Sequence, residues 1–120
     1  MTEYTLGAIE ARFADIIWQG EPILSSELAK RAEGELGWKK STTYTVLRRL
    51  CDKGIFKNDR GTVCSLISKE EFYSRQSERF VDETFNGSLP AFVAAFTSRK
   101  KLSADEVLEL KRLIEGYGDK

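Results

Sequence analysis

Histidine is absent from the 120-residue sequence, and cysteine, proline and methionine are scarce. Without histidine, imidazole general-base catalysis and zinc sites with histidine ligands are excluded. The sequence also has no Gly-rich phosphate loop. We therefore expect no enzymatic activity, no cofactor and no metal site.

Long apolar runs are missing as well. No segment approaches the roughly 18 apolar residues that a membrane-spanning helix requires, and the first residues, MTEYTLGAIE, lack the basic region and apolar stretch of a secretion signal. Two cysteines, Cys51 and Cys64, are too few for a disulfide framework and are expected to be reduced. These features predict a cytoplasmic protein without membrane insertion.

The net charge is zero, but the charges are unevenly distributed. Residues 1–35 carry seven acidic and three basic side chains, whereas residues 36–60 carry seven basic and two acidic ones. A single basic stretch in a neutral protein is typical of a localised phosphate-binding face. Charge alone leaves open the alternative of a solvated charged helix.

Apolar residues at helical spacing predict three helices, over about 6–19, 26–35 and 42–53. Ser25 and Ser41 are suited to cap the second and the third, and Gly54 to end the third. Residues 55–57 and 62–67 then favour strands, with a hairpin turn at 58–61. Three short helices followed by a hairpin form a winged helix-turn-helix.

Residues 69–120 are predicted to be helical. Ser88 is expected to cap a short helix with Pro90 in its first turn, and Ser103 and Glu106 to form a capping box for the last helix. The predicted fold class is mostly α with a small β-hairpin. It divides into a winged helix-turn-helix at 1–68 and a helical domain at 69–120.

The helix at 42–53 has two chemically different sides when drawn at about 100° per residue. The apolar side holds Thr43, Tyr44, Val46, Leu47, Leu50 and Cys51. The other side holds hydroxyls and arginines, which can bind base edges and phosphates in a major groove; similar faces also occur on helices that contact nothing. With the lysines before this helix and the cations of the hairpin, the predicted DNA-binding residues are Lys39, Lys40, Ser41, Thr42, Thr45, Arg48, Arg49, Lys57 and Arg60.

Several runs together resemble the penicillinase and methicillin-resistance repressor family (BlaI/MecI/CopY): residues 6–18, SSELA at 25–29, STTYTVLRRL at 41–50 and KGI at 53–55. The resemblance covers nearly the whole chain, and its most specific part is Ser-Thr-x-Tyr-Thr-x-Leu-x-Arg-Leu followed by Lys-Gly. It implies a homodimer that represses transcription from a palindromic operator in double-stranded DNA. It further implies that Ser41, Thr42, Thr45 and Arg48 contact bases and nearby phosphates.

The resemblance also implies that the C-terminal helices interlock with the partner chain. The residues agree, because three short helices cannot hide so many large apolar side chains alone; packing onto the winged helix in a monomer is the alternative. The predicted dimerisation residues are Phe72, Phe80, Phe85, Phe92, Phe96, Leu110 and Ile114.

Two departures from the family pattern concern regulation. Antibiotic-responsive members are cut at an Asn-Phe bond, where this chain has Ala95 and Phe96, so a sensor or protease partner is left open. The paired cysteines of the copper-responsive branch are absent from the tail at 113–120. Alternative functions are a ligand- or thiol-gated winged-helix regulator, with Cys64 as the thiol, and a winged-helix protein-interaction module.

Overall fold

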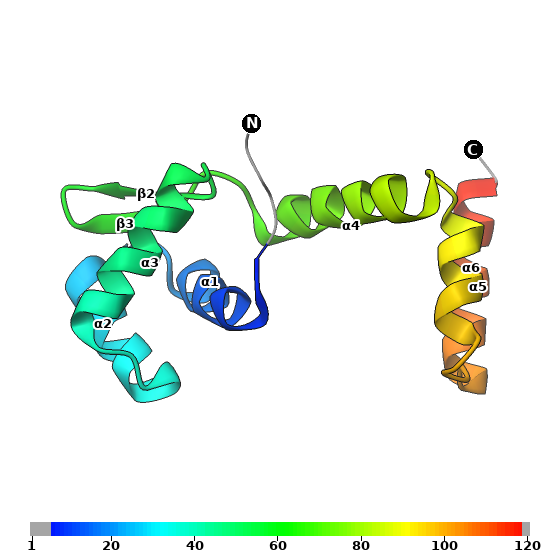
Figure 1. Cartoon of the computed structure of the whole chain (residues 1–120), viewed down its shortest axis with the longest axis horizontal. Coiled ribbons are helices and arrows are strands. Elements are labelled where there is room, and N and C mark those ends of the chain that lie inside the picture. The colour runs from blue at the N-terminus through cyan, green and yellow to red at the C-terminus, as the bar shows by residue number, and fades with distance from the viewer. Residues whose placement is uncertain (1–5, 119–120) are drawn as a thin grey trace. The chain divides into compact units, whose positions relative to one another are not determined.

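A computed structural model describes residues 6–118; the outermost parts of the two expected domains, 1–5 and 119–120, lie outside the described residues. Within this range the chain forms six helices and a three-stranded antiparallel sheet (Figure 1), which confirms the predicted fold class. The elements are α1 (Ala8–Gly20), β1 (Ile23–Leu24), α2 (Ser25–Leu36), α3 (Lys40–Asp52), β2 (Phe56–Asp59), β3 (Thr62–Ser65), α4 (Lys69–Phe85), α5 (Leu89–Thr97) and α6 (Ala104–Gly118).

The chain divides into two compact units, here called unit 1, which ends at Arg79, and unit 2, which begins at Phe80. The expected domain boundary lay between residues 68 and 69, just before α4. The division between the units falls inside α4, so this helix contributes its first residues to unit 1 and its last to unit 2.

The core of unit 1 is built from α1, α2, α3, the sheet and the start of α4. Apolar residues recur on one side of each helix, which is the pattern that buries a helix face against a common core. The largest fully buried side chains are Phe13, Phe56, Phe72, Ile17, Leu28, Leu50, Ile55, Val63 and Thr43.

Trp18 of α1 joins the sheet to α4. Its ring centroid lies 5.1 Å from that of Phe56 and 5.5 Å from that of Phe72, within the range of favourable aromatic pairs. Its indole N–H donates to the carbonyl of Ile67 at 3.1 Å. One large side chain thus packs against the wing and the first turn of α4.

The sheet has the order β1-β3-β2, and its first strand was not predicted. In β1, Ile23 pairs with Val63 of β3. The hairpin turn is shorter than expected, because β2 continues to Asp59 and only Arg60 and Gly61 lie between the strands. Both have positive φ, 52° and 94°, as a two-residue type I′ hairpin turn requires.

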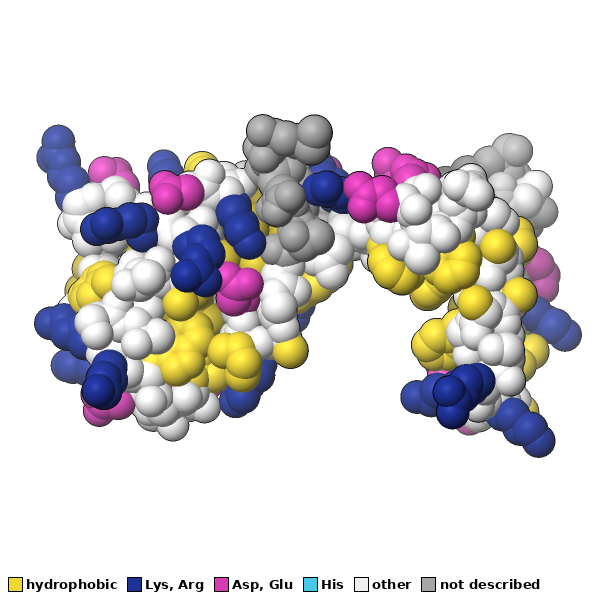
Figure 2. Space-filling view, viewed as in Figure 1, with side chains coloured by type: hydrophobic (Ala, Val, Ile, Leu, Met, Phe, Trp, Pro, Cys, Tyr) yellow, Lys and Arg dark blue, Asp and Glu magenta, His cyan; other side chains and the backbone are white. Residues whose placement is uncertain are grey.

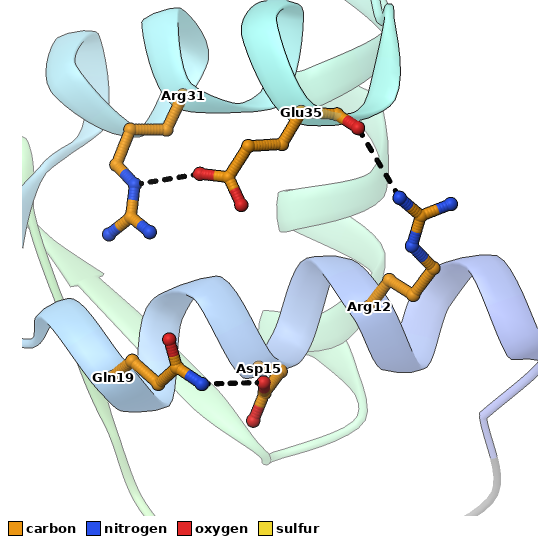
Figure 3. A network of polar contacts seen from close by, with 5 residues as sticks. All are labelled: Arg12, Asp15, Gln19, Arg31 and Glu35. Atoms are coloured by element: carbon orange, nitrogen blue, oxygen red, sulfur yellow. Dashed lines mark hydrogen bonds and ion pairs between the residues drawn. The ribbon is translucent and has the colours of Figure 1, made fainter.

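Polar contacts tie α1 to α2 on one side of unit 1 (Figure 3). Arg12 of α1 donates to the carbonyl of Glu35 at 3.3 Å, which satisfies an acceptor in the last turn of α2. The Glu35 carboxylate in turn pairs with Arg31 at 3.1 Å. The Asp15 carboxylate accepts one hydrogen bond from Gln19 and another from Lys69, the second at 2.6 Å. The bond to Asp15 raises the pKa of Lys69.

Local capping interactions position the helices of unit 2. The Ser88 hydroxyl accepts from the amide of Ala91 at 3.1 Å, and Pro90 lies in the first turn of α5. Ser103 and Glu106 bond reciprocally at 3.0 and 3.1 Å ahead of α6. Both predicted caps are confirmed.

Candidate nucleic-acid interface

Helix α3 starts earlier than its sequence suggested. It begins at Lys40, with Lys39 as the N-cap residue and no side-chain capping bond, so the prediction of Ser41 as the cap is wrong. The prediction of Ser25 as the cap of α2 is wrong too, because α2 begins at Ser25, with Leu24 as its N-cap residue and no side-chain capping bond. Ser41 lies in the first turn instead, and its carbonyl accepts a bond from Thr45. The predicted end is confirmed: Lys53 is the C-cap and Gly54 follows with φ 81°.

The two predicted sides of α3 are confirmed. Thr43, Val46, Leu47 and Leu50 are buried, and Tyr44 and Cys51 are half-buried. The residues exposed to solvent are Ser41, Thr42, Thr45, Arg48, Arg49 and Asp52. The hydroxyls and arginines of this second group, here called the outer face of α3, are therefore available to a partner.

The hydroxyls of the outer face differ in what they can offer. Thr45 donates its hydroxyl proton to the carbonyl of Ser41 at 2.9 Å, so its oxygen lone pairs and its methyl group remain for a partner. Thr42 has no side-chain hydrogen bond within residues 6–118 and can both donate and accept. Neighbouring threonines thus present different hydrogen-bonding groups.

The cations of α3 also differ. Lys39 and Lys40 are exposed at its N-terminal end, where Lys40 Nζ lies 6.0 Å from the centre of the Tyr44 ring. Arg48 forms no hydrogen bond or ion pair inside the described range. Arg49 is paired instead, with its Nη1 atom 3.5 Å from Oε2 of Glu10 in α1.

The hairpin lies beside α3. Arg48 and Asn58 of β2 line one hollow of about 240 Å³, together with three further α3 residues, Tyr44, Leu47 and Cys51. The sequence assigned Asn58 only to the turn, where its side-chain oxygen does accept from the amide of Gly61 at 2.9 Å. Its position beside Arg48 was missed, because cross-element proximity leaves no local pattern in the sequence.

The two predicted cations of the hairpin are both exposed. Arg60 is at the turn, whereas Lys57 lies in β2 and pairs with Cys64 of β3. The turn itself is fixed to the start of α2, because the Ser25 amide donates to the Gly61 carbonyl at 2.7 Å. The wing is thus held close to the helical part of unit 1, whose visible face carries many Lys and Arg side chains (Figure 2).

Cys51 and Cys64 are not joined by a disulfide, and both are partly buried. Burial raises the pKa of the Cys51 thiol, as does the nearby charge of Asp52, while the backbone N–H of Asn58 acts in the opposite direction. A thiol with a raised pKa is a poor nucleophile at neutral pH. Within residues 6–118 no three His, Cys, Asp or Glu side chains are grouped so that they could hold a metal ion.

The predicted dimerisation residues are divided between the units. Phe72 is fully buried in the core of unit 1, so it has no surface to offer a partner. The other six lie in unit 2, where Phe85 and Phe92 are half-buried and Phe80 is 49 % exposed. The remaining three, which are also exposed, are Phe96, Leu110 and Ile114.

Unit 2 carries an apolar groove of about 470 Å³ between α5 and α6. Phe92 and Phe96 line one side, and Leu110 and Leu113 the other. The rings of Phe80, Phe85 and Phe92 contact one another with centroids 5.5 to 5.9 Å apart. Figure 2 shows hydrophobic side chains exposed along α5.

None of the helices in the described range is long and apolar enough to span a membrane.

Comparisons with known proteins agree on one family. The family model described as penicillinase repressor matches residues 6–116. The chain is 23 % identical over 115 residues to the methicillin resistance regulatory protein MecI of Staphylococcus aureus, covering 92 % of this chain and 94 % of MecI. It is 27 % identical over 112 residues to the penicillinase repressor of Bacillus licheniformis, covering 90 % and 88 % of the two chains.

Proposed function

The chain belongs to the penicillinase repressor family, and from this premise we propose that it is a cytoplasmic homodimer that represses transcription by binding a palindromic operator. It acts by binding and not by catalysis. In each protomer α3 enters the major groove of double-stranded DNA, and the hairpin contacts the adjacent backbone.

The observation that carries this proposal is the outer face of α3. Its hydroxyls and arginines are exposed while the opposite side of the same helix is buried in the core of unit 1. A helix held rigidly by one side and lined with hydrogen-bonding groups on the other fits a major groove about 12 Å wide. Lys39 and Lys40 at its start bind phosphates, and Arg48, free of internal ion pairs within residues 6–118, binds phosphate or guanine.

The hydrogen bond made by Thr45 sharpens the expected base contacts. Because its proton is held by the Ser41 carbonyl, Thr45 presents an acceptor and a methyl group. It therefore suits the amino group of adenine or cytosine, or the methyl group of thymine. Thr42 has both a donor and an acceptor to offer and accommodates more base types.

Homodimerisation is supported by the apolar surface of unit 2. Phe80, Phe96 and Ile114 are large apolar side chains exposed on unit 2, and a soluble chain normally covers extensive apolar surface with a partner. In a twofold dimer, the two α3 helices read equivalent half-sites about 34 Å apart, or at a multiple of one helical turn. An inverted repeat in the operator follows from this symmetry.

The test is selection of bound duplexes from a random DNA pool by the full chain, followed by affinity measurements on the selected sequence. We expect an inverted repeat, and an affinity that falls steeply with salt because phosphate contacts release counterions. Arg48→Ala should weaken binding and reduce the salt dependence, whereas Arg99→Ala in unit 2 removes the same charge and should not. Equal affinity of the wild type for selected and scrambled duplexes would overturn the proposal.

A further inference from the structure

Adjacent arginines on α3 have different surroundings. Arg48 has no polar partner among the described residues, whereas the Arg49 guanidinium lies 3.5 Å from the carboxylate of Glu10, 39 positions earlier in the sequence. The exposed fraction is 56 % for the Arg49 side chain and 21 % for that of Glu10. The acidic partner is therefore the more fixed of the two.

Glu10 is held in place by the start of its own helix. Its Oε1 atom accepts a hydrogen bond from the amide of Gly7 at 3.3 Å, and its Oε2 atom faces Arg49. Both carboxylate oxygens are thus engaged at once, one by the α1 N-terminus and one by α3. A negative charge near a helix N-terminus is also stabilised by the helix dipole.

We propose that Glu10 is a positioning residue that draws Arg49 away from the phosphate backbone and so limits the affinity of the protein for DNA of any sequence. This inference rests on the proposed DNA-binding function. The carboxylate cancels the charge of Arg49 locally and repels an approaching phosphate. Arg48 then remains as the α3 arginine whose full charge contributes to DNA binding.

The physical reason concerns non-specific binding. Affinity for an arbitrary sequence comes almost entirely from phosphate contacts, so each cation that reaches the backbone raises it. A repressor with neutral overall charge and one basic stretch gains selectivity when one of its groove-side cations is withheld. The Glu10–Arg49 pair supplies that restraint and leaves the hydroxyls of the outer face untouched.

The experiment compares Glu10→Gln with Glu33→Gln on a scrambled duplex at several salt concentrations. Glutamine at position 10 can still accept from the Gly7 amide, so the α1 cap is retained. Glu33 is exposed, and its side chain has no hydrogen bond or ion pair within residues 6–118, so its substitution changes the net charge equally. We expect Glu10→Gln to raise the affinity about threefold to tenfold and to steepen the salt dependence by about 0.9 per protomer, and Glu33→Gln to do neither.

A double-mutant cycle shows whether the effect acts through Arg49. In an Arg49→Gln background, Glu10→Gln should lose most of its effect, and Arg49→Gln alone should change the salt dependence much less than Arg48→Gln. Equal behaviour of the Glu10 and Glu33 variants, or an effect that persists without Arg49, would overturn the inference. Failure of the wild type to bind DNA at all would instead overturn the proposed function.

Discussion

Helices α1, α2 and α3 of unit 1 each bury at least three side chains, whereas α5 and α6 of unit 2 bury none. Both units are rich in large apolar residues, so composition does not explain the contrast. Unit 1 arranges its helices around a sheet and closes a core. Unit 2 instead leaves an open groove between α5 and α6, and half or more of the surface of Leu113 and Ile114 is exposed.

The difference indicates two sources of stability. A buried side chain contributes to folding of its own chain at any protein concentration. An apolar residue that is covered only by a partner stabilises the assembly, so its contribution depends on the protomer concentration. Under the proposed function, unit 1 should behave as a self-contained domain and unit 2 as half of an interface.

The largest expected difference in stability is between alanine substitutions of two phenylalanines in the same helix, α4. Phe72 is 0 % exposed in unit 1, and Phe80 is 49 % exposed in unit 2. Phe72→Ala should lower the free energy of unfolding of unit 1 by about 3 to 5 kcal/mol, regardless of protein concentration. Phe80→Ala should leave unit 1 unchanged and weaken only the concentration-dependent part of the stability of unit 2. Urea denaturation at several protein concentrations measures both effects. If Phe72→Ala and Phe80→Ala lowered the unfolding free energy of unit 1 equally, the contrast between the units would be contradicted.

A second test addresses the interface directly through Ile114. This side chain is 66 % exposed, so Ile114→Asp removes little packing within the protomer. A charge buried in an apolar interface is costly, and we expect the dissociation constant of the dimer to rise by about a hundredfold or more. Sedimentation analysis with circular dichroism separates dissociation from unfolding. Thr84→Asp, which adds the same charge at an exposed polar position of α4, is the matched control. If Ile114→Asp left the dissociation constant unchanged, the dimer interface would not include Ile114.

The contrast between Phe72 and Phe80 also shows which features could be predicted from the sequence. The two sides of α3, the caps at Ser88 and Ser103 and the wing are encoded by local spacing, and all were predicted. Phe72 and Phe80 look alike in that spacing, because helical periodicity identifies an apolar face but not what covers it. Tertiary contacts, such as that of Phe72 with Trp18, assign Phe72 to the core of unit 1.

The missed features all depend on contacts between distant residues. Strand β1 has only two residues, too few to show a period, and exists because it pairs with β3. Arg49 is predictable as an exposed cation of α3, but its pairing with Glu10 joins residues 39 apart. For the candidate interface, the sequence was sufficient to predict which residues are exposed and what chemistry they offer. The residues that they contact could be identified only from the fold.

A smaller effect is expected at a polar contact that spans unit 1. The Glu21 carboxylate accepts from the Ser65 amide at 2.7 Å and from the Ser65 hydroxyl at 2.8 Å, which fixes the end of β3 to the segment before β1. Glu21→Gln removes the charge from these bonds and should cost unit 1 about 1 to 2 kcal/mol. In thermal unfolding, the double variant should lose less unfolding free energy than the sum of the losses of Glu21→Gln and Ser65→Ala, because both single variants break the same contact. Additive losses would show that the two residues act independently.

The smallest effect tests whether local caps stabilise unit 2 where burial does not. The hydrogen bond from the backbone amide of Ser103, followed by the nearby Ser103 hydroxyl, lowers the pKa of Glu106, so the folded state favours the carboxylate. The stabilisation is complete above the unfolded-state pKa and is lost as the pH falls through the lower folded-state value. Carboxyl NMR titration should therefore give Glu106 an apparent pKa below the ordinary value for glutamate. On acidification below about pH 4, near the ordinary value for glutamate, the wild type should lose helicity of α6. Glu106→Gln keeps the capping bond without the charge, so its helicity should not change over this range, whereas Glu109→Gln should follow the wild type. If Glu106 instead titrates at the ordinary value for glutamate, the charge of the capping box contributes nothing to the stability of α6.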